Sequence, residues 1–135
     1  MHESQTLEGG KKKNIPEALR YYDLALKYAP HLPQAYNGKG VIYFNAKKYS
    51  EAKTFFLEAL KYNPSDGTAM GNAGSCFLIL GDNDNAISYL LKAVDYAPNN
   101  PSILTNLGIA YENKGDKVQA NAWYAKADQV SKSSR

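Results

Sequence analysis

The sequence of 135 residues predicts an all-α protein that is built as an array of stacked helix pairs. The first observation is a phrase that returns every 34 residues: LKYAP, LKYNP and VDYAP end at Pro30, Pro64 and Pro98. The second observation is that apolar residues within each interval recur at helical spacing. A fixed period of this length is typical of architectures in which each unit buries its apolar face against its neighbours.

Each interval contains two predicted helices with a short polar turn between them. In the second helix, an apolar stripe runs at positions i, i+4 and i+7: Ala52, Phe56 and Ala59. Residues at this spacing share one face of a helix, so the stripe is expected to face the core. The turns between the two helices hold Lys47-Lys48, Gly81-Asp82 and Gly115-Asp116.

The first helix of each interval holds a glycine with an aromatic residue three positions later: Gly40 and Tyr43, Gly74 and Phe77, Gly108 and Tyr111. Because glycine has no side chain, the two helices of a pair can approach closely there, and the aromatic ring fills the remaining space. Proline ends each pair, since it lacks a backbone donor and clashes with the preceding turn. Asn100 is a suitable N-cap in front of Pro101.

These positions resemble those of the tetratricopeptide repeat (TPR) family, whose 34-residue pattern combines small, aromatic, alanine and proline positions. The matches are Tyr36, Gly40, Tyr43, Ala52, Phe56, Ala59 and Pro64 in repeat two, Met70, Gly74, Phe77, Ala86, Leu90, Ala93 and Pro98 in repeat three, and Leu104, Gly108, Tyr111, Ala120, Tyr124 and Ala127 in repeat four. The resemblance implies a right-handed α-solenoid of stacked antiparallel helix pairs, whose first helices line the concave side.

We expect the TPR array to span residues 15–130, with the second helix of repeat one over about Ile15 to Tyr28, and repeats at 33–66, 67–100 and 101–130. Residues 1–14 are expected to form an N-terminal segment, as a partial first helix or a tag, because Gly9-Gly10 and Lys11 to Lys13 interrupt that helix. Residues 131–135 are expected to be a polar tail. Lys39 replaces the usual leucine, and its stem is expected to lie on the core with its amine in water.

The resemblance places partner contacts at fixed places on the first helices. The candidates are Asn37, Val41, Phe44 and Asn45 in repeat two, Thr68, Asn72, Ser75, Leu78 and Ile79 in repeat three, and Ser102, Thr105, Asn106, Ile109 and Asn113 in repeat four. Asn72 and Asn106 are 34 residues apart and are expected to project in one row. An amide offers both a donor and an acceptor, which suits the backbone of an extended peptide. The alternative is that asparagine is simply a common polar residue at this place.

The same places argue against one class of TPR ligand. Relatives that clamp the C-terminal carboxylate of heat-shock chaperones place lysine and arginine on the first helices. Here the corresponding places hold Gln34, Thr68 and Ser102, followed by Gly38, Asn72 and Asn106. A carboxylate bound there would lack a charged partner.

Composition and motifs argue against several other classes of function. The net charge of +3 is too mild for a strong nucleic-acid binder, and no apolar run reaches the length of a membrane span. Without a secretory signal at the start, the cytoplasm is the default expectation.

The run from Gly81 to Asn85 lacks the glutamate of a calcium loop, and Cys76 is expected to be a core residue. No catalytic motif is present in the sequence, and we expect neither a metal nor a cofactor.

The predicted function is therefore a non-catalytic scaffold or adaptor that binds a segment of a protein partner in its concave groove. A second hypothesis is self-assembly into a homo-oligomer through exposed end helices, with Trp123 or Tyr124 uncovered. RNA binding and a role as the targeting part of a larger enzyme are weaker alternatives. Tyr28, Tyr62 and Tyr96 each lie two residues before the proline that ends a helix pair, and we expect them to pack between successive repeats.

Overall fold

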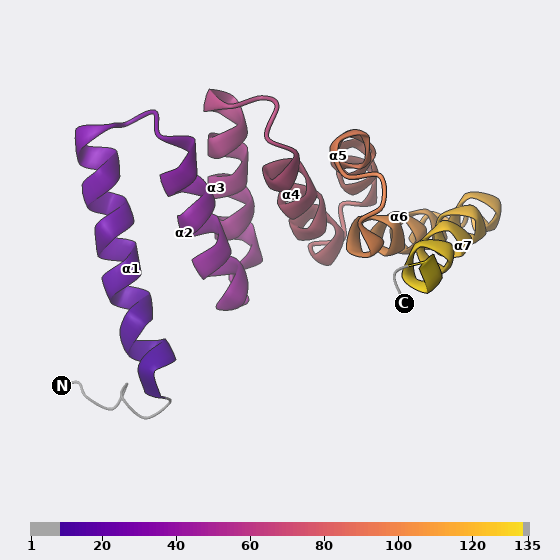
Figure 1. Cartoon of the computed structure of the whole chain (residues 1–135), viewed down its shortest axis with the longest axis horizontal. Coiled ribbons are helices and arrows are strands. Elements are labelled where there is room, and N and C mark those ends of the chain that lie inside the picture. Colours follow the sequence, from indigo (N-terminus) through magenta and orange to yellow (C-terminus); the bar gives the residue numbers. More distant parts are fainter. Residues whose placement is uncertain (1–8, 134–135) are drawn as a thin grey trace. The chain divides into compact units, whose positions relative to one another are not determined.

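The computed structural model describes residues 9–133, with side chains from residue 17 onward. The described residues form helices and no strands (Figure 1). The helices are α1 (Gly9–Tyr28), α2 (Pro33–Asn45), α3 (Tyr49–Tyr62), α4 (Gly67–Ile79), α5 (Asn83–Tyr96), α6 (Pro101–Asn113) and α7 (Lys117–Ser133). The chain divides into two compact parts that we describe separately. The N-terminal part ends at Asn63 and the C-terminal part begins at Pro64.

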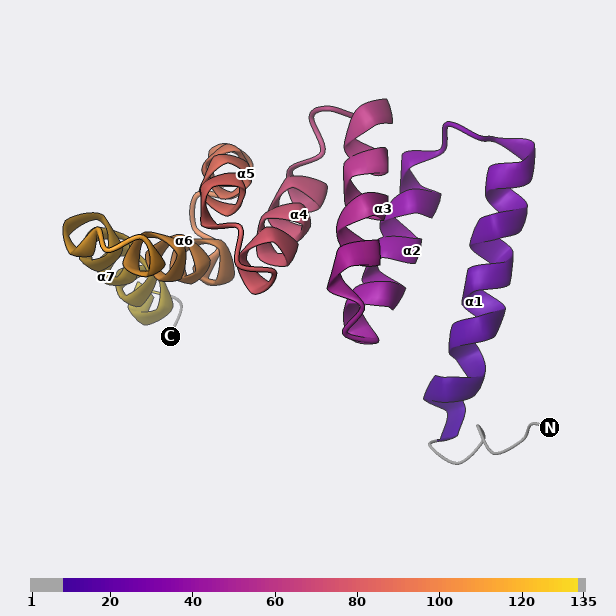
Figure 2. The ribbon, with the colours of Figure 1, turned by 180° about the vertical axis from the view of Figure 1, so that it is seen from behind.

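In the N-terminal part, α2 and α3 form a close helix pair that both views show side by side (Figures 1 and 2). The apolar stripe of α3 is its core, since Ala52, Phe56 and Ala59 are at most 1% exposed. A Cβ atom at Gly40 would lie 2.6 Å from Cε1 of Phe56, so the absent side chain of the glycine is what admits the ring. The predicted stripe and glycine contact are confirmed.

The C-terminal part repeats this pairing twice, as α4 with α5 and α6 with α7, and α5 also packs on α6. Its largest fully buried side chains are Leu90, Leu104, Leu107 and Cys76. Cys76 is thus a core residue, as predicted. The all-α fold of stacked helix pairs is confirmed.

The three helix pairs turn at equivalent residues. Lys47, Gly81 and Gly115 are 34 residues apart, and their φ angles are 63°, 86° and 83°. Glycine adopts this left-handed conformation without a steric cost, whereas lysine does not. The first of the three turns is therefore the one that holds a strained backbone.

Polar side chains cap the N-termini of α4 and α6 in the C-terminal part. Oδ1 of Asn100 accepts hydrogen bonds from the backbone N–H of Ser102 at 2.9 Å and of Ile103 at 3.3 Å. Oδ1 of Asp66 accepts from the N–H of Ala69 at 3.1 Å. The N-cap predicted at Asn100 is confirmed, and it fixes the start of α6.

Two helices are longer than the sequence pattern indicates. Helix α1 begins at Gly9 instead of about Ile15, so the glycines and lysines do not interrupt its backbone. Helix α7 continues to Ser133, three residues past the predicted end of the array. The place equivalent to Pro98 is Lys132, so nothing terminates α7 there.

The tyrosines that precede the prolines at the ends of the helix pairs do not all pack between repeats. Tyr28 is 78% exposed and Tyr96 is 56% exposed, so the expected packing is wrong for both. Tyr62 is half-buried because it stacks on Tyr36, with ring centroids 5.8 Å apart, and contacts His31. Repeat three offers Tyr96 no rings at the equivalent places, which hold Met70 and Ser65.

The expected exposure of Trp123 or Tyr124 is also wrong, since both side chains are half-buried. The ring of Tyr124 packs on Gly108, and its hydroxyl donates a hydrogen bond to Oε1 of Glu112 at 2.7 Å. Lys39 lays its stem on the core as predicted. Its amine does not go to water, because it binds Oδ1 of Asp23 at 2.6 Å and lies 4.7 Å from the Phe55 ring.

Replacement of Gly74 by alanine should lower the free energy of unfolding by about 1–3 kcal/mol. The new Cβ would lie 2.7 Å from Cγ of Leu90 and 3.3 Å from its backbone nitrogen, so the two helices would have to separate. Gly71→Ala in the same helix is the matched control, because its Cβ would meet its nearest atom at 3.6 Å. Urea unfolding followed by circular dichroism compares the two variants; equal losses would contradict the close-contact argument.

Asn100→Ala should destabilise the chain by about 1 kcal/mol, because two backbone donors at the start of α6 lose their acceptor. Asn99→Ala, which changes the exposed neighbour in the same loop, should have little effect. Thermal unfolding measures both. A loss of the same size in Asn99→Ala would show that the loop, and not the cap, is what matters.

Candidate partner-binding groove

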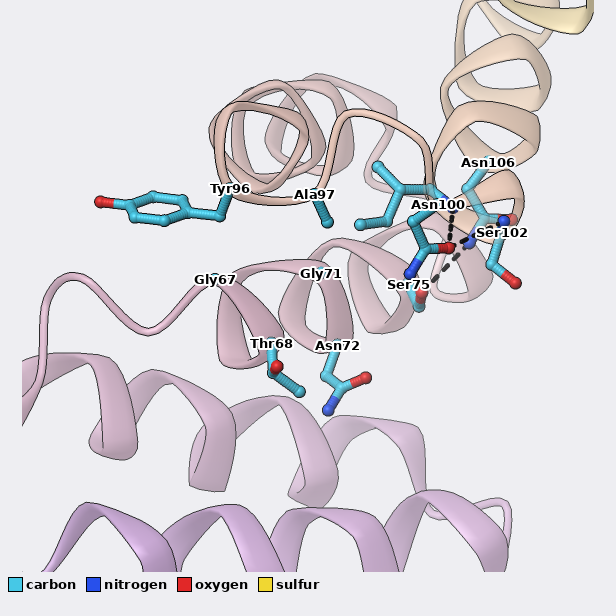
Figure 3. Close-up of a pocket in the computed structure, with 11 residues that line it drawn as sticks. Gly67, Thr68, Gly71, Asn72, Ser75, Tyr96, Ala97, Asn100, Ser102 and Asn106 are labelled. Carbon is cyan, nitrogen blue, oxygen red and sulfur yellow. Dashed lines mark hydrogen bonds between the residues drawn. The ribbon is translucent and has the colours of Figure 1, made fainter. Parts of the chain in front are cut away.

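A groove of about 310 Å³ lies between α4 and α6 in the C-terminal part. Figure 3 shows its lining residues, which come from three elements and the loop before α6. They are Gly67, Thr68, Gly71, Asn72 and Ser75 of α4, Tyr96 and Ala97 at the end of α5, and Asn100, Ser102, Ile103 and Asn106 at the start of α6. The first helices of two successive repeats therefore face one space.

Helical spacing places the polar residues of α4 on the groove. Thr68, Asn72 and Ser75 are at i, i+4 and i+7, so they share the face that looks into it. Ser102 and Asn106 have the same relation on α6. The groove is thus built by the same periodicity that builds the core, on the opposite side of the first helices.

Two glycines set the shape of the floor. A Cβ at Gly67 would lie 2.6 Å from Cβ of Tyr96, so α4 begins in close contact with the last turn of α5. A Cβ at Gly71 would lie 3.6 Å from Cδ1 of Ile103, an ordinary van der Waals distance that leaves space unused. A side chain at Gly71 would therefore occupy part of the groove, whereas one at Gly67 would push α4 and α5 apart.

The amide of Asn106 is held by a hydrogen bond across the groove. Its Nδ2 donates to Oγ of Ser75 at 3.1 Å, which links α6 to α4 (Figure 3). This bond fixes the orientation of the amide and turns its nitrogen towards α4. Its carbonyl oxygen is the atom that remains to accept a hydrogen bond from a ligand.

Asn72 differs from Asn106. Among the described residues, no hydrogen-bond partner of its amide is found, although the side chain is half-buried. In Figure 3, Thr68 and Asn72 point away from the cluster formed by Ser75, Asn100 and Asn106. Both predicted asparagines line the groove, but they do not present their amides in parallel.

The groove is neutral, since none of its lining residues is charged. The hydrogen bonds of the C-terminal part that involve charged side chains lie outside the groove. A hydrogen bond to the Asp84 carboxylate raises the pKa of Lys114, and a hydrogen bond to Glu112 raises the pKa of Tyr124. Lys114 joins α6 to α5 and Tyr124 joins α7 to α6, so these shifts report helix packing.

Several candidates on α4 and α6 lie outside the groove lining: Leu78, Ile79, Thr105, Ile109 and Asn113. Ile79 is 49% exposed and Ile109 is 36% exposed, so both offer apolar surface without a hollow. Nδ2 of Asn113 donates to Oδ1 of Asn83 at 3.0 Å, which gives it a structural contact with the start of α5.

The candidates of repeat two lie on α2 in the N-terminal part and are described there by themselves. Val41 and Asn45 are exposed, and Asn37 is half-buried. Phe44 packs edge-on against Tyr49, with ring centroids 5.1 Å apart. The neighbouring Gly38 is covered by the ring of Tyr22 from α1.

Prediction from the sequence missed part of the groove. Its lining includes Gly67, Tyr96, Ala97, Asn100 and Ile103, which do not appear among the predicted contacts. A rule based on fixed places of the first helices cannot find Tyr96 and Ala97 at the end of a second helix, and those places do not include Gly67, Asn100 or Ile103. The cap signal at Asn100 was available in the sequence, but it indicated a helix start and not a surface.

The described residues include no cluster of three or more histidine, cysteine, aspartate or glutamate side chains that could hold a metal ion. Over the same part of the chain, no helix combines the length and the apolar character that crossing a membrane requires.

Comparison with known proteins agrees with this architecture. A family model described as "Tetratricopeptide repeat" matches residues 33–66, and one described as "TPR repeat" matches residues 74–115. No curated protein sequence matches the chain.

Several solved structures share the fold. One titled MamA MSR-1 has a TM-score of 0.79 at 21% identity and covers 93% of this chain and 72% of its own. The MamA RS-1 ArsTM double mutant has a TM-score of 0.81 at 23% identity, with 90% and 68% covered. MamA 41-end from Desulfovibrio magneticus RS-1 has a TM-score of 0.79 at 23% identity, also with 90% and 68% covered.

At such identities the structural likeness shows the fold alone. The family assignment comes from the two sequence matches, which together span more than half of the chain. The glycine contacts and buried alanines of the helix pairs agree with it. The chain belongs to the tetratricopeptide repeat family.

Proposed function

We propose that this TPR protein is a non-catalytic interaction scaffold that holds an extended segment of a partner protein in the groove between α4 and α6. The observation that supports this most directly is the Asn72 amide, which lines the groove and has no hydrogen-bond partner among the described residues. A ligand can supply hydrogen bonds to this half-buried amide in place of those that it makes with water.

The chemistry of the groove suits a peptide backbone. Asn72 offers a carbonyl oxygen and an NH₂ group, and Asn106 offers its remaining carbonyl oxygen. An extended segment presents alternating N–H and C=O groups, with a rise of about 3.3 Å per residue. Donors and acceptors on α4 and α6 can therefore pair with successive backbone groups without selecting a charged side chain.

The apolar part of the lining indicates what the partner's side chains are. Ile103 is 9% exposed and lies opposite Gly71, where unused space remains. We therefore expect a small or medium apolar side chain of the partner beside these residues. The volume of about 310 Å³ is at the lower end of ligand pockets, so the groove holds a short stretch of the partner.

A charged ligand is disfavoured by the same geometry. A carboxylate in the groove would be partly desolvated without a cation to pair with it. RNA binding would require clustered basic residues along the protein surface that contacts the phosphate backbone of the RNA. The neutral lining supports neither a chaperone C-terminus nor an RNA strand as the ligand.

A peptide selected from a displayed random library against the full chain provides a defined probe for this proposal. Asn72→Ala combined with Asn106→Ala should weaken its binding by roughly tenfold to a hundredfold, because two hydrogen-bonding amides worth about 1–3 kcal/mol together are lost. Fluorescence anisotropy measures the affinity. Asn121→Ala on the exposed surface of α7 is the matched control and should bind like the wild type.

Unchanged affinity in the double variant would contradict the role of the groove. Affinity capture from the source lysate, followed by mass spectrometry, then searches for a natural partner. We expect such a partner to be captured by the wild type and by Asn121→Ala, and to be lost from the double variant. A natural partner that stays bound to the double variant would place the contact on another surface.

Because the groove is neutral, the affinity of the selected peptide should change little between low and high salt. Titrations at several salt concentrations test this. A steep fall of affinity with salt would instead indicate an ionic contact outside the groove, of the kind that nucleic-acid binding shows.

A further inference from the structure

The hydrogen bond between Ser75 and Asn106 joins the first helices of two successive repeats across the groove (Figure 3). Helix α4 packs directly on α6, and both side chains are half-buried. Nδ2 of Asn106 lies 3.1 Å from Oγ of Ser75, and the hydroxyl oxygen accepts from the amide nitrogen. The Asn106 amide therefore has a defined orientation before a ligand binds.

The repeat pattern makes this bond specific to the groove between α4 and α6. The residues 34 positions before and after Ser75 are Val41 and Ile109, whose side chains form no hydrogen bonds. The residue equivalent to Asn106 in repeat three is Asn72, whose amide has no hydrogen-bond partner among the described residues. The groove thus contains two asparagines at equivalent places, of which one is held by a neighbouring side chain.

This difference determines what each amide can offer a ligand. An asparagine amide has a donor end and an acceptor end, and the torsion that turns it has a broad energy profile. Asn72 can therefore turn either end towards a ligand. Asn106 would first have to break its bond to Ser75, and a bond of this kind favours the bonded orientation by roughly twofold to tenfold.

The backbone that carries Asn106 is fixed as well. Oδ1 of Asn100 accepts from the N–H groups of Ser102 and Ile103, which caps the first turn of α6. Asn106 follows one turn later, and its neighbour Leu107 is fully buried. Because both the helix and the amide plane are held, the carbonyl oxygen of Asn106 has a fixed place in the groove.

We propose, building on the function proposed for this groove, that Ser75 is a positioning residue for Asn106. It holds the amide so that the groove accepts a hydrogen bond from the partner at this place and does not donate one. On an extended segment the matching donor is a backbone N–H. Proline has no backbone N–H, so the partner residue that meets Asn106 is not proline. Asn72 sets no such condition, because its amide turns to suit the ligand.

Hydrogen exchange of the side-chain amides, measured by NMR on the ¹⁵N-labelled full chain without ligand, tests the orientation. We expect the hydrogen-bonded Nδ2 proton of Asn106 to exchange roughly twofold to tenfold more slowly than the amide protons of Asn72, because it is donated to Ser75. In Ser75→Ala the Asn106 protons should exchange like those of Asn72. Ser75→Thr keeps the hydroxyl and should restore the slow proton.

The peptide selected from the random library against the full chain is the probe for the second experiment. In a series of synthetic versions, each backbone N–H in turn is replaced by an ester oxygen, which removes one donor and keeps every side chain. One ester should weaken binding to the wild type about tenfold, because a donor is lost and an oxygen faces the carbonyl of Asn106. The same ester should have little effect on binding to Asn106→Ala, which identifies it as the group that meets Asn106.

The ratio of the affinities for the parent peptide and this ester measures the role of Ser75. In Ser75→Ala the ratio should fall to about threefold or less, because the released amide can turn its nitrogen to the ester. Ser75→Thr should regain the wild-type ratio. Ser102→Ala removes another hydroxyl from the groove lining and should leave the ratio unchanged. A general change in helix packing would weaken both peptides alike and leave the ratio as it is.

Two results would overturn the role of Ser75 while the groove keeps its function, with binding still weakened in the Asn72→Ala, Asn106→Ala double variant. One is equal exchange of the Asn72 and Asn106 protons, which would mean that the amide oxygen of Asn106 faces Ser75. The other is the same affinity ratio in wild type and Ser75→Ala. Unchanged binding of the parent peptide to the double variant would instead contradict the groove as the binding site, and the role of Ser75 with it.

Discussion

The structure depends on one contact that recurs in each complete repeat: a bulky residue of the second helix packs against the bare backbone of a glycine in the first. Phe56 meets Gly40, Leu90 meets Gly74, and Tyr124 meets Gly108. At each of these glycines a Cβ atom would lie closer to the ring or branch than real side chains allow. The glycine therefore sets the distance between the helices, and the fully buried alanines beside it are small for the same reason.

Close pairing on one side of the first helices leaves their other side available for binding. On α4 and α6 this free side holds polar, uncharged residues, and the two helices converge on a groove whose shape comes from Gly67, Gly71 and Ile103. The bond from Asn106 to Ser75 stiffens the groove without filling it. Binding surface and core are thus two faces of the same helices, and changes to the core glycines are expected to reach the groove through helix position.

Helix α1 shows what a second helix looks like without this contact. Its bulky residue, Tyr22, covers Gly38 of the following repeat, and its outer rings remain exposed. Ala18 and Ala25 of α1 are only half-buried, whereas their equivalents in repeats two and three are fully buried. Whether a repeat position is core or binding site therefore depends on the neighbouring helix and not on the residue alone.

The sequence by itself determined the helix pairs of repeats two to four and the residues between them, because a 34-residue period with glycine, alanine and proline at fixed places is typical of stacked helix pairs. It also placed Asn72 and Asn106 on the first helices that form the groove. Tertiary structure alone decided that the Asn106 amide binds Ser75, that the end of α5 lines the groove, and that Tyr28 and Tyr96 are exposed while Tyr62 is stacked. These outcomes depend on which side chains meet across helices, and a local pattern contains no information on the partner that each side chain finds.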